Sequence, residues 1–125
     1  MIYRNLIKLL LITAVLPSYA NTTTYSCNYP IYTDKEGVHK VTKKFELNFI
    51  FDDKAKKNYM LGNNGSTEVG RFKYSEHVVF AEITSFGSFM TTTIDKDLNS
   101  VHSRNTVMFG GKLLASQYFG KCVVK

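Results

Sequence analysis

Two chargeable side chains, His102 and Arg104, stand two residues apart in the segment V-H-S-R-N-T-V, which has the composition of a β-strand. Alternate residues of a strand face the same side, so these two side chains share one face. The other face of this strand is richer in apolar residues, and we expect it to point inward. Arg71 and Lys73 have the same spacing in an earlier strand-like segment. The four residues together predict a basic contact patch on the outer surface, and the alternative is an ordinary polar outer face.

An arginine guanidinium has a planar fork that suits a carboxylate or a phosphate, so such a patch favours binding of an acidic group. Protonation of His102 adds a second positive charge beside Arg104. We therefore expect partner binding to become stronger at mildly acid pH.

The other chemistry-bearing residues do not form a known catalytic or metal-binding pattern. His39, His77 and His102 lie in three separate segments, without the close spacing of a zinc site. The sequence has no G-x-S-x-G motif, and no glycine-rich phosphate loop precedes a helix. The acidic pairs at 52–53 and 95–97 lie in turn-like segments, where water would hydrate both carboxylates. We expect no enzyme activity, no cofactor and no bound metal.

The sequence pattern predicts that short strands position these residues. Phe45, Leu47, Phe49 and Phe51 alternate with mostly polar neighbours, as on a strand with one buried face. Turn-forming Gly, Asn and Asp residues separate similar runs along the rest of the chain. The pattern predicts an all-β fold, a small antiparallel meander barrel or bent sandwich of about eight strands. The segment 112–116 is expected to be one helical turn or a loop.

The interior of such a barrel has two possible uses. The aromatic residues either fill it, which we favour for so short a chain, or line a ligand cup formed by residues such as Phe49, Phe80 and Tyr118.

The two cysteines stand near opposite ends of the predicted β domain. Cys27 lies in the first predicted strand and Cys122 in the last. In an oxidising compartment the two would form one disulfide that ties the first strand to the last; the alternative is two free thiols.

Residues 1–20 have the layout of an export signal. Arg4 and Lys8 precede a short apolar run, 9–16, and Ser18 and Ala20 are small residues at a cleavage site. The alternative is a membrane anchor, but the run is far shorter than the roughly 20 residues that span a bilayer. We expect a signal peptide, a single β domain over 21–125 without a membrane span, and a periplasmic or secreted location in a bacterium.

The charge balance is mildly basic, with sixteen Lys and Arg against ten Asp and Glu. This suits an acidic partner or an anionic envelope surface, although solubility alone also explains it. Nucleic-acid binding is not expected in an exported protein without a basic stripe. The partner predicted from the sequence is a protein of the cell envelope.

The segment TTTIDKDLNSVHSRNTVMFGGKLLASQYFGKC resembles the C-terminal part of small exported bacterial proteins of uncharacterised activity, which carry a V-H-S-R-like strand, a Gly-Gly turn and a final Y-x-G-x-C. The leading Tyr25-Ser26-Cys27 is more distantly similar to the start of periplasmic inhibitors of C-type lysozyme. That resemblance implies a small barrel that inhibits an envelope-targeting enzyme. The sequence thus predicts a binding or interaction protein, and the alternative is a small barrel that carries an apolar ligand.

Overall fold

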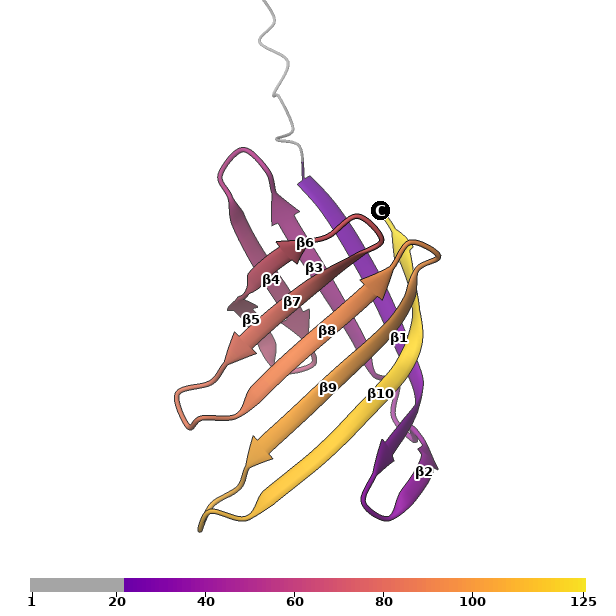
Figure 1. Cartoon of the computed structure of the whole chain (residues 1–125), viewed down its shortest axis with the longest axis vertical. Helices are drawn as coiled ribbons and strands as arrows, with labels where there is room; N and C mark the ends of the chain where they lie inside the picture. The colour runs from indigo at the N-terminus through magenta and orange to yellow at the C-terminus, as the bar shows by residue number, and fades with distance from the viewer. Residues whose placement is uncertain (1–21) are drawn as a thin grey trace, which may run out of the picture.

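The protein is described by a computed structural model over residues 22–125, and this part of the chain consists of strands, turns and loops (Figure 1). The ten strands are β1 (Thr22–Asp34), β2 (Gly37–Lys40), β3 (Glu46–Asp52), β4 (Lys57–Gly62), β5 (Gly65–Glu68), β6 (Gly70–Lys73), β7 (His77–Ile83), β8 (Phe89–Asp95), β9 (Asn99–Val107) and β10 (Leu113–Val124). Within these residues no helix is long and apolar enough to cross a membrane. The predicted signal peptide lies outside the described residues.

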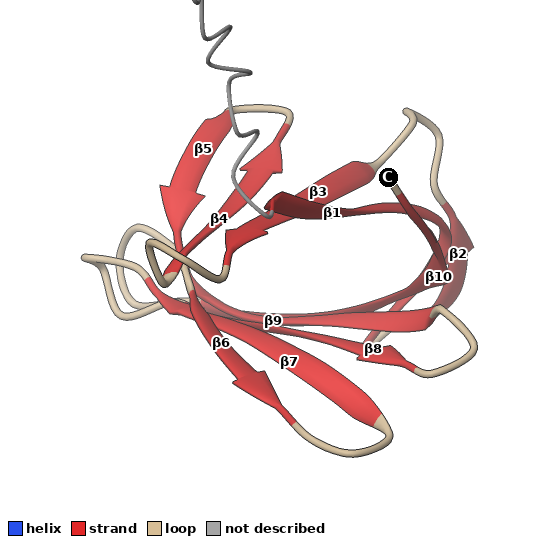
Figure 2. Ribbon diagram, turned by 90° about the horizontal axis from the view of Figure 1, so that it is seen from above, coloured by secondary structure: helices blue, strands red, loops and turns tan. Residues whose placement is uncertain are grey.

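All strands belong to one antiparallel sheet that coils into a nearly closed barrel. Its order is β5-β4-β3-β1-β10-β9-β8-β7-β6, and β2 pairs with the lower half of β1. Figure 2 shows the two walls of the barrel, with β3, β4 and β5 on one side and β7, β8 and β9 on the other. The edges of the sheet are β5 and β6, which follow one another in the chain with only Val69 between them.

The first and last strands lie side by side in the middle of the sheet. Cys27 of β1 pairs directly with Cys122 of β10, and the two form a disulfide, as predicted. Both cysteines are buried, so the disulfide joins the two adjacent strands inside the core rather than at its rim.

A bulge bends β1 beside β10. Asn28 pairs with Lys121 and Ile31 pairs with Phe119, so Tyr29 and Pro30 together lie opposite Gly120. A proline is tolerated there because a bulge interrupts the ladder of hydrogen bonds. A Cβ atom at position 120 would overlap the carbonyl oxygen of Asn28, so only glycine fits.

The core fills one end of the barrel. The alternation predicted around Phe49 is confirmed, since Leu47, Phe49 and Phe51 are buried and the residues between them are only half-buried. Phe49 stacks on Phe80 from the opposite wall, with 4.6 Å between the ring centroids. The buried apolar residues are Cys27, Tyr29, Leu47, Phe49, Phe51, Val69, Val78, Phe80, Ile94 and Cys122.

The predicted fold class is confirmed, but ten strands replace the expected eight. One extra strand is the short β2, which pairs back on β1 after a turn at Lys35 and Glu36. Another arises because the strand expected over 67–74 divides at Val69 and Gly70 into β5 and β6, which belong to opposite edges of the sheet. The prediction of a helical turn or loop over 112–116 is wrong, since Leu113 already begins β10 and pairs with Val107.

Candidate functional site

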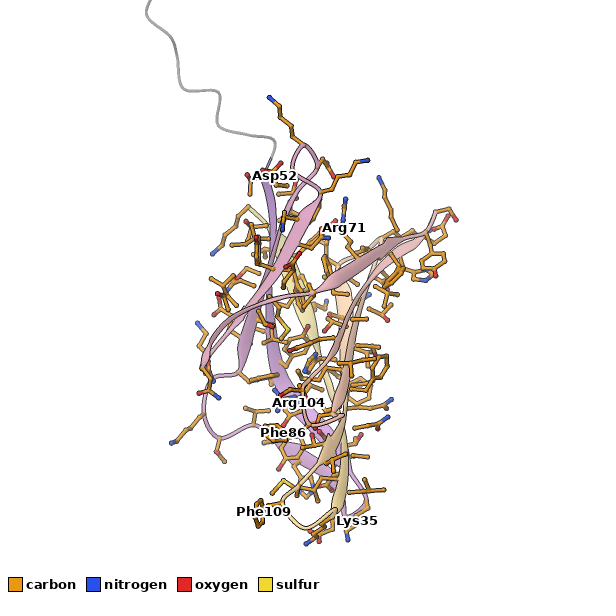
Figure 3. The ribbon with its side chains drawn as sticks, turned by 90° about the vertical axis from the view of Figure 1, so that its left-hand side faces the viewer. Lys35, Asp52, Arg71, Phe86, Arg104 and Phe109 are labelled. Carbon is orange, nitrogen blue, oxygen red and sulfur yellow. A yellow bond between two sulfur atoms is a disulfide. The ribbon has the colours of Figure 1, made fainter. Side chains whose placement is uncertain are left out.

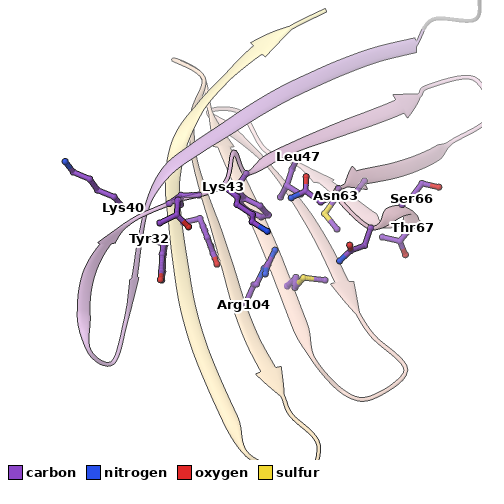
Figure 4. Close-up of a pocket in the computed structure, with 17 residues that line it drawn as sticks. Tyr32, Lys40, Lys43, Leu47, Asn63, Ser66, Thr67 and Arg104 are labelled. Atoms are coloured by element: carbon purple, nitrogen blue, oxygen red, sulfur yellow. The ribbon is translucent and has the colours of Figure 1, made fainter.

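The other end of the barrel is open and forms a cleft of about 710 Å³ (Figure 4). Its walls come from β1, the loop between β2 and β3, the β4–β5 hairpin, and the inner faces of β8, β9 and β10. The lining residues are Tyr32, Lys40, Val41, Thr42, Lys43, Phe45, Leu47, Met60, Gly62, Asn63, Asn64, Gly65, Ser66, Thr67, Met90, Arg104 and Tyr118.

Arg104 of β9 extends into this cleft. Its Nε donates a hydrogen bond to Nε2 of His102, at 3.0 Å. The guanidinium carbon lies 4.9 Å from the centre of the Phe45 ring and 5.1 Å from that of Tyr118. Stacking against two rings holds the planar group in place, because cations are attracted to aromatic faces.

The charge of Arg104 has no acidic counterpart in the described structure. Within residues 22–125 no carboxylate lies within 4 Å of its guanidinium, and its two terminal nitrogens have no hydrogen-bond partner. The guanidinium is only half-buried, so water or a ligand reaches it from the cleft. An arginine that is always charged and lacks a carboxylate partner is suited to an anionic ligand.

His102 is completely buried and holds Arg104 from behind. Because its Nε2 accepts the hydrogen bond from Arg104, the proton of the neutral ring lies on Nδ1 and is donated to Oγ1 of Thr92, at 2.7 Å. Burial, and then the charge of Arg104, lower the pKa of His102 to about 3. The imidazole is therefore neutral between pH 5 and 8, and it positions Arg104 rather than adding charge.

The predicted orientation of His102 and Arg104 was wrong. Both face the barrel interior, because His102 pairs with Thr92 on one side and Tyr118 on the other, and all three side chains point inward. The apolar side chains expected inside, such as Val101, lie instead on the half-buried outer face. Burial also keeps His102 neutral at mildly acid pH, so it does not supply the second positive charge on which the expected pH dependence of binding rested.

Arg71 and Lys73 do not join Arg104 in one patch. Figure 3 shows Arg71 near the opposite end of the barrel from Arg104. There Nη2 of Arg71 donates to Oδ1 of Asp53 at 2.7 Å, and its guanidinium lies 4.0 Å above the centre of the Phe51 ring. Lys73 is exposed beside it, and the two line a smaller cleft of about 360 Å³ that also contains acidic residues.

The charged residues that line the open cleft are all basic. Lys40 and Lys43 join Arg104, and no Asp or Glu is among the described residues that form its wall. Opposite them, the turn at Asn63 and Asn64 supplies amide groups that can donate hydrogen bonds. None of these four residues was predicted as a site residue from the sequence, although the run K-V-T-K-K at 40–44 indicates a basic segment.

One wall of the cleft is aromatic. Tyr118 lies between Phe45, at 4.7 Å between ring centroids, and Tyr32, at 5.1 Å, and Tyr32 in turn stacks on His39. The cleft therefore combines a flat apolar wall with a few polar groups, as small-molecule sites do, and its volume falls within their usual range. No group of three or more His, Cys, Asp or Glu residues within 22–125 is placed to hold a metal ion.

The chain matches no known protein family, and comparison with curated proteins and with solved structures finds no match either.

Proposed function

We propose that this protein is an exported binding protein that holds a carboxylate or phosphate group of its partner against Arg104, in the open end of the barrel. The observation that carries the proposal is the guanidinium itself. It is fixed by His102 and two aromatic rings, it has no carboxylate within reach in residues 22–125, and it faces a cleft of about 710 Å³.

The free-energy cost of placing the Arg104 charge without an ion-pair partner supports a binding role. A half-buried guanidinium without an ion-pair partner loses part of its hydration, and no carboxylate of the described residues compensates for that loss. An anionic ligand restores the missing interaction, and Lys43 adds to the attraction, whereas the side chain of Lys40 extends away from Arg104 (Figure 4).

The residues that line the cleft are suited to binding rather than to catalysis. The one imidazole in contact with Arg104 is completely buried, and its proton is committed to Thr92. The carboxylate pair or activated nucleophile that hydrolysis needs is absent from the described lining. We therefore retain the proposal that the protein is not an enzyme.

The proposed location is the periplasm or the exterior of a bacterial cell. The buried disulfide between Cys27 and Cys122 is typical of an oxidising compartment. The signal-like sequence over 1–20 leads to the same proposal.

A second candidate is an interaction protein whose partner is another protein of the envelope, for example a lysozyme that it inhibits. The cleft is open enough to admit an acidic side chain from a partner loop, and the exposed Phe86 lies near the level of Arg104 (Figure 3). In both cases Arg104 receives the anionic group; the two differ in the size of the partner.

The test is an NMR titration of the disulfide-bonded protein with benzoate and with inorganic phosphate. We expect the Nε–H signal of Arg104 and the ring signals of Tyr118 to shift with a common dissociation constant, and Arg104→Gln to abolish these shifts. Lys121→Gln is the matched control, because Lys121 is an exposed cation on the outer wall. Equal shifts in both variants, or none in the unaltered protein, would refute the proposal. Capture of purified lysozyme by the unaltered protein but not by Arg104→Gln would favour the second candidate.

A further inference from the structure

A second hollow, of about 700 Å³, adjoins the cleft that contains Arg104. The two share Tyr32 and Tyr118 in their walls. The lower hollow lies along the ends of β9 and β10. Of the apolar residues around it, Leu114 shares the inner face with Arg104, whereas Val107, Leu113 and Ala115 lie on the other face of these two strands.

The strand register places residues of the two hollows along one face of the β9–β10 ribbon, and we call the two hollows together the groove. Arg104 pairs with Ser116, and Thr106 pairs with Leu114, so these four side chains lie on the same inner face of the β9–β10 ribbon. Ser116 and Leu114 both line the lower hollow. With a rise of about 3.3 Å per residue, the apolar wall at Leu114 begins about 7 Å below the level of Arg104.

The groove leads to an exposed apolar end of the barrel. The side chain of Leu113 is 75% exposed, and those of Phe86 and Phe109, in the β7–β8 and β9–β10 turns, are 85% and fully exposed. Figure 3 places Phe109 at the lower end of the molecule with Lys35, and Phe86 higher, close to the level of Arg104. Exposed aromatic turn tips are unusual for a surface that faces only water.

The distribution of charge gives the groove a direction. Its upper part is lined by the cations Lys40, Lys43 and Arg104 and by no acid. The lower part has Asp34 and Glu36 at its rim, opposed by Lys35 and Lys112, and the apolar residues lie between these two regions. A ligand that matches both parts is anionic at one end and apolar along the rest.

We propose that the ligand is a single-chain anionic amphiphile, with its carboxylate or phosphate at Arg104 and its alkyl chain in the lower groove along Leu114. This rests on the proposed function and specifies the ligand class for the same site. The stacked pair of Tyr32 and Tyr118 is the point at which head group and chain meet, since both hollows include it.

The experiment is calorimetric titration with the straight-chain carboxylates butanoate, hexanoate, octanoate and decanoate, all below micelle-forming concentrations. Each methylene that becomes buried should tighten binding by about 4-fold, until the chain fills the groove. Arg104→Gln should weaken binding of every acid by a similar factor of about 10 or more, and decanol should bind more weakly than decanoate.

A second variant separates the chain from the head group. Leu114→Asn should reduce the gain per methylene while binding of butanoate stays unchanged. Val123→Asn is the control, because Val123 is an exposed apolar residue of the same strand outside the groove. Since Leu114 is 41% exposed, its replacement is not expected to unfold the protein, and a thermal melt checks this.

The outcomes separate this inference from the function on which it rests. If the affinity is independent of chain length but is lost in Arg104→Gln, the inference of an amphiphile is refuted and the proposed anion site is retained. Affinity that grows with chain length but is unchanged in Arg104→Gln refutes both. A concentration-dependent dimer that Leu114→Asn dissociates, with no response to decanoate, shows that a second copy of the chain covers the groove and overturns the inference.

Discussion

Acidification from pH 7 to pH 5 should destabilise this protein through His102. In the folded chain the imidazole is buried and its pKa is lowered to about 3, whereas an unfolded histidine titrates near 6.5. Between these values the unfolded state binds one proton more than the folded state, so the free energy of unfolding falls as the pH falls. The contribution is fully present above pH 6.5.

The size of this loss of stability follows from the pH range between the two pKa values of His102. Each pH unit within that range changes the free energy of unfolding by about 1.4 kcal/mol, so lowering the pH from 7 to 5 should reduce it by about 2 kcal/mol. This is a large part of the 5–15 kcal/mol that typically stabilises a domain. The physical cause is that a proton on Nε2 would break the hydrogen bond from Arg104 and place two positive charges side by side without water.

The assay is urea denaturation at several pH values between 5 and 7, for the unaltered protein and for His102→Gln. Glutamine retains hydrogen-bonding groups but does not titrate, so the difference between the two proteins isolates His102 from the other histidines. We expect the unaltered protein to lose about 2 kcal/mol more than the variant over this range. Parallel curves for the two proteins would show that His102 is not buried as a neutral ring, and that the account of how Arg104 is held is wrong.

Two further predictions concern the frame of the barrel. Phe49→Ala should lower the free energy of unfolding by about 3–5 kcal/mol in chemical denaturation, because the side chain is fully buried against Phe80. The control Lys44→Ala removes only an exposed ion pair and should change the free energy of unfolding by less than about 1 kcal/mol. Equal losses in the two variants would contradict the assigned core. Replacing Cys27 and Cys122 together by Ala should cost about 4 kcal/mol or more, since their disulfide closes nearly the whole domain into one loop, and finding two alkylatable thiols in the folded unaltered protein would exclude that bond.

Local patterns in the sequence were sufficient to predict much of the fold. The alternation around Phe49 predicted a strand with one buried face, because pleating places every second side chain on the same side. The Gly110-Gly111 pair predicted the β9–β10 turn, and both residues adopt the positive φ angles that glycine tolerates. The pairing of Cys27 with Cys122 followed from export chemistry and from the presence of only two cysteines.

The orientation of β9 did not follow from the sequence. The face with Val101 and Val107 is the more apolar one in the sequence, yet it is the outer face, so the alternation alone led to the wrong orientation. The neighbouring strands decided it, because Thr92 and Tyr118 offer His102 a hydrogen bond and aromatic contacts inside the barrel. A buried polar side chain is stable only where such partners are present, and the partners belong to other strands.

The sequence by itself therefore determined most of the strands and turns and the disulfide, since each depends on residues close in the chain or on a unique pair. The cleft was decided only by the tertiary structure. Lys43, Asn63 and Arg104 come from three distant segments, and each alone is typical of a solvated surface. Coiling of the sheet left one end of the barrel unfilled and brought these side chains around the same opening, and that arrangement gives Arg104 its proposed role.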